Sequence, residues 1–177
     1  MTTQQISIDT EFAALRELYV EIDALLARPA DEVRVVRADV SGWNAEQHLA
    51  HVSLANELVV RNLRSLLKGA GPFVVEVGEP PQAALDVLAS GKFPRGAAQA
   101  PRIVRPPDEV VREYLVEWLA DNRRDFGALA AQARELEATT KKVPHQILGP
   151  LTAAQWMRFA AAHTRHHLEI VREIVSA

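Results

Sequence analysis

Two histidines near the end of the chain, His163 and His167, are spaced four residues apart within an apolar helical pattern. On a helix that advances about 100° per residue, their imidazoles lie about 40° apart, one turn above the other. Trp156, Ala160 and Ile170 fall on the same side of the helix, so both rings are predicted to point toward the core. Neutral imidazole is the commonest metal ligand in proteins. The spacing therefore predicts a chelating pair for a metal ion.

A third ligand must come from another part of the chain, because catalytic zinc sites use three protein ligands and keep one position open. Helix bundles build such sites from side chains on facing helices. A predicted helix over residues 44–68 carries two candidates, His48 and His51. On a helical wheel His48 is nearer the middle of the apolar stripe and His51 is nearer its edge. Spacing alone therefore slightly favours His48.

The remaining histidines are interpreted as neighbours of this site. His166 lies about 100° from His167 around the helix, which predicts a position at the rim. His145 precedes the last predicted helix and is interpreted as a signature of that turn, or alternatively as part of a pocket mouth. A different interpretation of His163 and His167 is a pair of core histidines that hydrogen-bond to carboxylate or carbonyl groups.

Composition and charge limit the class of protein. The 177 residues are 48% hydrophobic and 24% charged, which is typical of one globular domain over residues 1–177. The formal net charge of −3 gives no electrostatic case for nucleic acid, so no nucleic-acid partner is expected. The chain has no cysteine, which excludes disulfides, thiolate ligands and a cysteine nucleophile.

Signals for export or membrane insertion are missing from the sequence. Residues 1–8 lack the basic start and apolar centre of a signal peptide. No apolar run approaches the roughly 18 residues that span a bilayer. A cytoplasmic protein without a membrane partner is therefore expected.

Four long amphipathic helices are predicted to position the histidines. Their apolar residues recur three and four positions apart, with charged residues between them. Because no convincing strand pair is present, the predicted fold class is all-α, an up-down four-helix bundle. The tryptophans Trp43, Trp118 and Trp156 are predicted to anchor its core. The expected helices cover residues 9–28, 44–68, 108–137 and 152–175.

Two of these helices have a clear start signal. Asn44 and Gln47 have the spacing of a capping box, as do Thr152 and Gln155.

Between the second and third helices, residues 69–107 contain seven of the ten prolines and five of the eight glycines. This stretch is predicted to be a long loop with one short helix near residues 81–89, and such loops often shape a functional site.

Two blocks of sequence carry a family resemblance. The first is Gly42-Trp43, the capping region and a histidine eight residues after the tryptophan, which is His51. The second is His145-x-x-x-Gly149-x-Leu151-Thr152-x-x-x-Trp156, followed by His163-x-x-x-His167. On these blocks the chain resembles the DinB-like superfamily, the DinB/YfiT group of metal-binding four-helix bundles. With the four helix lengths, the resemblance covers nearly the whole chain.

The resemblance implies that His51, His163 and His167 are the metal ligands. His48 then takes a position that is usually aliphatic in such proteins, and it is interpreted as a buried neighbour that could orient a ligand. Relatives often carry a glutamine where this chain has Ile170. The adjacent Glu169 is about 200° from His167 and is predicted to face water.

The resemblance also implies a function. The expected cofactor is a divalent transition metal, zinc or nickel, and the expected activity is that of a thiol S-transferase or a related metal-assisted hydrolase. Its partners would be a low-molecular-weight thiol, an electrophile and a second copy of the chain in a homodimer. The alternative hypothesis is a non-catalytic, stress-associated metal-binding dimer.

Overall fold

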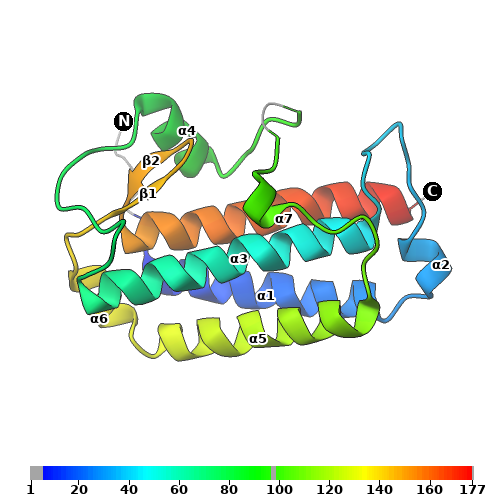
Figure 1. Cartoon of the computed structure of the whole chain (residues 1–177), viewed down its shortest axis with the longest axis horizontal. Coiled ribbons are helices and arrows are strands. Elements are labelled where there is room, and N and C mark those ends of the chain that lie inside the picture. Colours follow the sequence, from blue (N-terminus) through cyan, green and yellow to red (C-terminus); the bar gives the residue numbers. More distant parts are fainter. Residues whose placement is uncertain (1–5, 97–98, 177) are drawn as a thin grey trace.

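The computed structural model describes residues 6–96 and 99–176, and most of them are helical, as predicted. The described part does not include residues 1–5, 97–98 and 177. The expectation that the chain carries no signal peptide falls partly on residues 1–5, and residues 97–98 belong to the predicted loop. Four long helices lie side by side (Figure 1). They are α1 (Ile8–Leu26), α3 (Ala45–Lys68), α5 (Arg112–Ala130) and α7 (Ala153–Val175).

Helices α3 and α7 begin where the capping signals predicted. The Asn44 Oδ1 atom accepts from the Gln47 backbone N–H at 2.9 Å, and the Gln47 Oε1 atom accepts from the Asn44 N–H at 3.1 Å. Thr152 and Gln155 make the same reciprocal pair at 3.3 and 3.0 Å. These bonds satisfy N–H groups that have no partner within the helix. Both histidine-bearing helices therefore have a defined start.

The relative directions of the helices follow from the ion pairs between them. Arg112 at the start of α5 binds Glu46 at the start of α3, and Arg64 lies 2.8 Å from Asp125 near their other ends. Helices α3 and α5 therefore run parallel, as the colours in Figure 1 also show. The predicted strict up-down order is wrong at this step, because the segment between these helices returns along the length of the molecule instead of crossing one end.

A buried carboxylate fixes this arrangement. Glu46 is 1% exposed, and its two oxygens accept from Arg34 Nε and Arg112 Nε, each at 2.7 Å. Two guanidinium groups offset the cost of burying the carboxylate charge. Arg112 also donates to the Leu26 and Arg28 carbonyls at 3.2 and 3.0 Å, where a cation stabilises the end of α1. One arginine thus joins α1, α3 and α5.

A layer of buried polar side chains connects the four long helices. Tyr19 from α1 donates to Asn122 of α5 at 3.2 Å and accepts from Asn56 of α3 at 3.2 Å. Asn56 also donates to Thr164 of α7 at 3.2 Å. All four side chains are buried. Since buried polar groups need partners, this layer favours one register of the helices.

The predicted third helix is interrupted. Helix α5 ends at Ala130, and a short helix α6 (Ala133–Ala138) follows after a break. Leu115, Leu119 and Phe126 face the core, whereas Trp118 is 37% exposed and Val111 is 49% exposed. The prediction that Trp118 anchors the core is wrong, because the buried face of α5 includes Leu119, the next residue, and successive residues point about 100° apart.

A hairpin precedes α7, where no strand pair was expected. Strands β1 (Val143–His145) and β2 (Gly149–Leu151) pair in antiparallel register. The His145 Nδ1 atom accepts from the Ile147 and Leu148 backbone N–H groups at 3.2 and 3.1 Å, which closes the turn. Trp156, 2% exposed, donates from its indole to the Val143 carbonyl at 3.0 Å. The hairpin is thereby held against α7.

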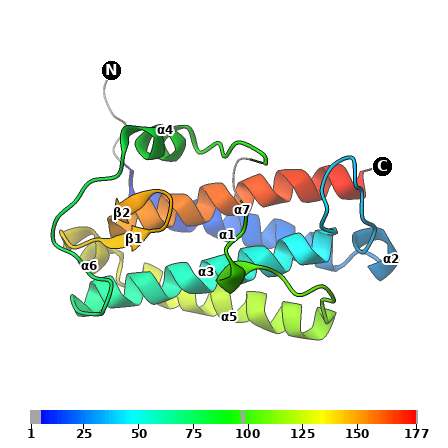
Figure 2. The same ribbon diagram turned by 45° about the horizontal axis from the view of Figure 1, so that its top comes forward.

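The segment between α3 and α5 covers one side of the long helices. It contains α4 (Gln82–Ser90), close to the short helix predicted there, and a 3₁₀ turn, η1 (Arg102–Val104). Figure 2 shows α4 on the α7 side and η1 against α3. A short helix, α2 (Ala30–Val33), lies in the connection from α1 to α3. Among the described helices, none is both long and apolar enough to cross a membrane.

Candidate metal centre

Three histidines meet between α3 and α7. His51 comes from the second turn of α3, and His163 and His167 come from successive turns of α7. The Nε2 atom of His163 lies 3.3 Å from that of His51 and 3.2 Å from that of His167. The three side chains offer ring nitrogens within 4.8 Å of one another, and this group could hold a metal ion. The structure thus brings together the three residues predicted as ligands.

The ring of His51 is oriented by the long segment. Its Nδ1 atom lies 2.7 Å from the Val104 carbonyl oxygen in η1. A carbonyl oxygen only accepts, so Nδ1 carries the proton and Nε2 keeps its lone pair. A ligating histidine in proteins usually donates its other N–H to such an acceptor. His51 therefore presents its free nitrogen toward His163.

The ring of His167 is held in a similar way by His48. Their Nδ1 atoms lie 2.9 Å apart, and His48 Nε2 lies 2.9 Å from Ser41 Oγ. When His48 donates from Nε2 to Ser41, its Nδ1 accepts the proton of His167 Nδ1. That tautomer leaves Nε2 of His167 free toward the centre. His48 is 3% exposed and does not belong to the three-histidine group.

His163 occupies the middle of the group and differs from its neighbours. Its ring stacks on Phe159, with centroids 5.1 Å apart and planes at 19°, and Phe93 lies edge-on at 5.9 Å. Its Nδ1 atom is buried and has no hydrogen-bond partner among the described atoms. Aromatic packing, and not a hydrogen bond, therefore orients this ring.

Burial keeps the imidazoles neutral. Burial is the main cause that lowers the pKa of His163 and His167 well below the usual value, and the neighbouring imidazoles lower it further. Burial also lowers the pKa of His51, although its bond to Val104 opposes the shift. The pKa of His48 falls to about 4, chiefly through burial. Neutral rings are the form that binds metals.

The residues present fit a transition-metal ion. Zinc–nitrogen bonds in a tetrahedral site place neighbouring ligand nitrogens about 3.3–3.4 Å apart, and the observed separations from His163 are 3.2 and 3.3 Å. Lone pairs at such distances repel one another unless a proton or a cation lies between them. Oxygen ligands, which calcium and magnesium require, are not part of the group. The donor set therefore suits a transition-metal ion better than a hard cation.

The other predicted residues lie around the group. His166 is half-buried beside Phe93, with ring centroids 6.0 Å apart, in agreement with a rim position. His145 both closes the hairpin turn and lines the cavity described below. Glu169 is exposed, as expected, and Ile170 is 7% exposed.

Two orienting groups were not found from the sequence. Val104 acts through its backbone oxygen, which no side-chain type signals. Ser41 precedes the capping region, and its role depends on His48 reaching back to it. The only signal in the sequence was His48, because a buried histidine is expected to have a hydrogen-bond partner.

A cavity of about 540 Å³ opens onto the three histidines. Helices α3 and α7 form one wall, and the long segment and the hairpin turn form the other. Its volume lies in the range of small-molecule sites. The three histidines therefore face a cavity that is large enough to hold a small reactant.

The sequence was compared with known families, curated proteins and solved structures. The model of the DinB superfamily matches residues 13–171, which is most of the chain and includes all six histidines. No curated protein and no solved structure matches the chain significantly.

Proposed function

The chain belongs to the DinB superfamily, as its sequence predicted, and we propose that His51, His163 and His167 hold one divalent transition-metal ion in a catalytic site. The convergence of their Nε2 atoms, with the outward nitrogens of His51 and His167 held by Val104 and His48, carries this proposal. Zinc or nickel is the proposed ion.

The proposed activity is that of a thiol S-transferase or a related metal-assisted hydrolase. When bound, the ion would act as a Lewis acid and lower the pKa of a thiol or water, so that a nucleophile exists at neutral pH. The chain has no cysteine, so a nucleophilic sulfur would belong to the cosubstrate. Phe159 and Phe93 would keep water from the His163 side, and the adjacent cavity would orient the second reactant.

Metal analysis tests the site. Purified protein, stripped with a chelator and reloaded with zinc, nickel or manganese, is expected to retain one ion per chain after gel filtration. His51→Ala and His163→Ala are expected to lose it, because two imidazoles bind far more weakly than three. His166→Ala is the matched control, since this rim histidine of the same helix is outside the group. Wild-type protein that retains none of the three metals would refute the site.

Turnover separates the enzyme from the alternative, a non-catalytic metal-binding protein. Loss of free thiol is followed in the presence of an electrophile, with metal-loaded, metal-free and His163→Ala protein. Thiol consumption that requires both metal and His163 supports the enzyme. A stoichiometric metal without any acceleration over buffer would favour the binding protein.

We further infer that the four long helices form the four-helix bundle of the DinB/YfiT type, and that two chains associate. Tyr114 and Trp118, one turn apart on α5, are 56% and 37% exposed, and Val111 beside them is 49% exposed. An apolar surface of this kind supports a homodimer. Light scattering of wild type and Tyr114→Asp tests the inference: a wild-type protein that is monomeric at micromolar concentration would contradict it.

A further inference from the structure

The cavity beside the three histidines has a lining that selects its occupant. We propose that it binds an uncharged, largely apolar small molecule with an aromatic ring, which would be the electrophilic substrate. Its role as substrate rests on the proposed function, whereas its binding depends only on the cavity.

The walls of the cavity are apolar and rich in aromatic rings. Among the described residues that line it there is no aspartate, glutamate, lysine or arginine. Phe93 and Phe159 contact each other edge-on at 5.9 Å, and Phe159 contacts Trp156 at 5.7 Å. A planar apolar group can pack among such rings. The aromatic part of the lining comprises Trp43, Phe73, Phe93, Trp156 and Phe159.

The rim of the cavity exposes large apolar side chains from three separate segments. Phe73 follows α3 and is 70% exposed, Ile103 lies in η1 and is 65% exposed, and Ile147 lies in the hairpin turn and is 55% exposed. Single exposed apolar residues are common, but three that gather at one opening mark a binding site. An apolar ligand would cover them.

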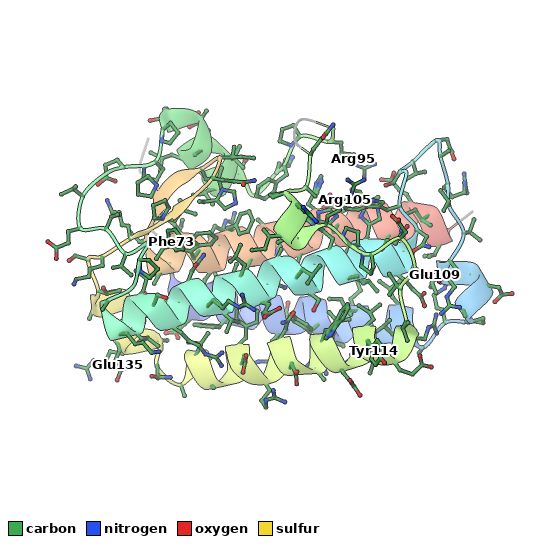
Figure 3. All side chains as sticks on the ribbon, in the orientation of Figure 1. Phe73, Arg95, Arg105, Glu109, Tyr114 and Glu135 are labelled. Carbon is green, nitrogen blue, oxygen red and sulfur yellow. The ribbon has the colours of Figure 1, made fainter. Side chains whose placement is uncertain are left out.

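Three cationic side chains near the cavity bind partners that do not line it. Arg95 makes two contacts with Glu173, at 2.6 and 2.7 Å, and Arg158 donates to the Leu88 carbonyl at 2.8 Å. Figure 3 shows Arg95 and Arg105 apart from Phe73. Lys142 binds the Gly78 carbonyl at 2.5 Å. In the metal-free protein, a carboxylate or sulfonate inside the cavity would lose its hydration without gaining a cationic side chain from the lining.

The polar groups of the lining suit a neutral molecule. They are amides and imidazoles, and burial lowers the pKa of His145 to about 4, so that ring is uncharged at neutral pH. Amides and neutral imidazoles can bind a carbonyl, nitro or hydroxyl group by hydrogen bonds. An anionic thiol cosubstrate would have to keep its charged groups outside the cavity.

Two fluorescent probes that differ by one charge test this inference. N-phenyl-1-naphthylamine is neutral, and 8-anilino-1-naphthalenesulfonate is the same skeleton with a sulfonate. Each is titrated into full-length protein, both metal-loaded and chelator-treated, with probe emission and energy transfer from tryptophan as readouts. The neutral probe is expected to bind saturably, with a Kd at least about tenfold below that of the sulfonate.

Substitutions at exposed positions locate the binding. Ile147→Asp, at the rim, is expected to raise the Kd of the neutral probe about fivefold or more, because it places a carboxylate at the opening. Val20→Asp is the matched control, since Val20 is 66% exposed on α1 and does not line the cavity. Circular dichroism melting checks that both variants fold.

The outcomes distinguish this inference from the proposed function. Equal affinity for the two probes, no saturable binding of the neutral probe, or equal effects of Ile147→Asp and Val20→Asp would overturn the inference. Saturable neutral binding that persists in a protein without metal would support the inference while the metal site fails.

Discussion

His48 and His167 face each other through their Nδ1 atoms, which lie 2.9 Å apart. One proton lies between these atoms, so the ring that donates it has its Nε2 free of hydrogen. This series of hydrogen bonds ends at Ser41. Its Oγ atom lies 2.9 Å from His48 Nε2 and 3.1 Å from the Trp43 backbone nitrogen. A proton on His48 Nε2 directs the proton of His167 to Nδ1, which is the tautomer that leaves Nε2 available to a metal.

Replacement of His48 should therefore weaken metal binding without removing a ligand. His48→Leu is expected to raise the zinc Kd about 10- to 100-fold, because the acceptor for the His167 N–H is lost. His48→Asn is expected to recover much of the affinity, since its amide oxygen can accept the same proton. Competition with a chromophoric chelator measures both constants. If His48→Leu binds zinc as tightly as wild type, His48 does not orient the ligand.

Metal binding should also raise the stability of the folded protein. Free metal at 100 times its Kd stabilises by about 2.7 kcal/mol, which corresponds to a rise in Tm of roughly 5–10 °C for a chain of this size. His163→Ala is expected to melt at the same temperature with and without metal. Scanning calorimetry with zinc and with chelator measures the shifts, and an equal rise in both proteins would place the metal elsewhere.

Periodicity was sufficient to predict the convergence of His163 and His167. Two residues spaced four apart on one helix point to the same side of it. The capping pairs Asn44–Gln47 and Thr152–Gln155 likewise depend on local geometry alone, and they determine where α3 and α7 begin. His51 required more, since the choice between it and His48 depends on how α3 is rotated against α7. The helical wheel slightly favoured His48, whereas the family resemblance indicated His51, which joins the three-histidine group.

Features that depend on distant pairs could not be predicted. The parallel direction of α3 and α5 is maintained by Glu46 and Arg112, which are 66 residues apart and have no local signature. The hairpin before α7 is closed by His145 and held by Trp156, residues that the sequence marked as important without indicating strands. Residue type alone did not predict the burial of Trp118. This large aromatic residue on an amphipathic helix was predicted to lie in the core, but it is partly exposed.

The hairpin histidine should make stability depend on pH. Burial lowers the pKa of His145 to about 4 in the folded protein, against about 6.5 in the unfolded chain. The unfolded chain therefore binds more protons between these values, so the stability contributed by this residue is complete above pH 6.5 and decreases as the pH falls toward 4. From pH 7 to pH 5 the contribution is expected to decrease by about 1–2 kcal/mol.

Urea unfolding of chelator-treated protein at the two pH values measures this loss. His145→Asn is the matched control, because its amide oxygen can accept from the Ile147 and Leu148 N–H groups but does not titrate. The other histidines titrate in both proteins, so the difference between wild type and variant isolates His145. Identical losses in the two proteins would show that its ring is not kept neutral by the fold.

A substitution in the buried polar layer should lower the free energy of unfolding. Tyr19→Phe removes one hydroxyl that donates to Asn122 and accepts from Asn56, each at 3.2 Å. Two buried amides then lose a partner, and one of them, Asn56, already has an Oδ1 atom without one among the described atoms. The free energy of unfolding is expected to fall by about 1–3 kcal/mol.

Thr140→Val is the matched control, since Thr140 is exposed and its hydroxyl can bind water, so a change within about 0.5 kcal/mol is expected. Denaturant unfolding of both variants at one pH makes the comparison. Thr164, which accepts from Asn56, directly follows His163, so a disturbed layer should also reach the metal centre. Tyr19→Phe is therefore expected to weaken zinc binding as well as stability, whereas an unchanged zinc Kd would separate the layer from the site.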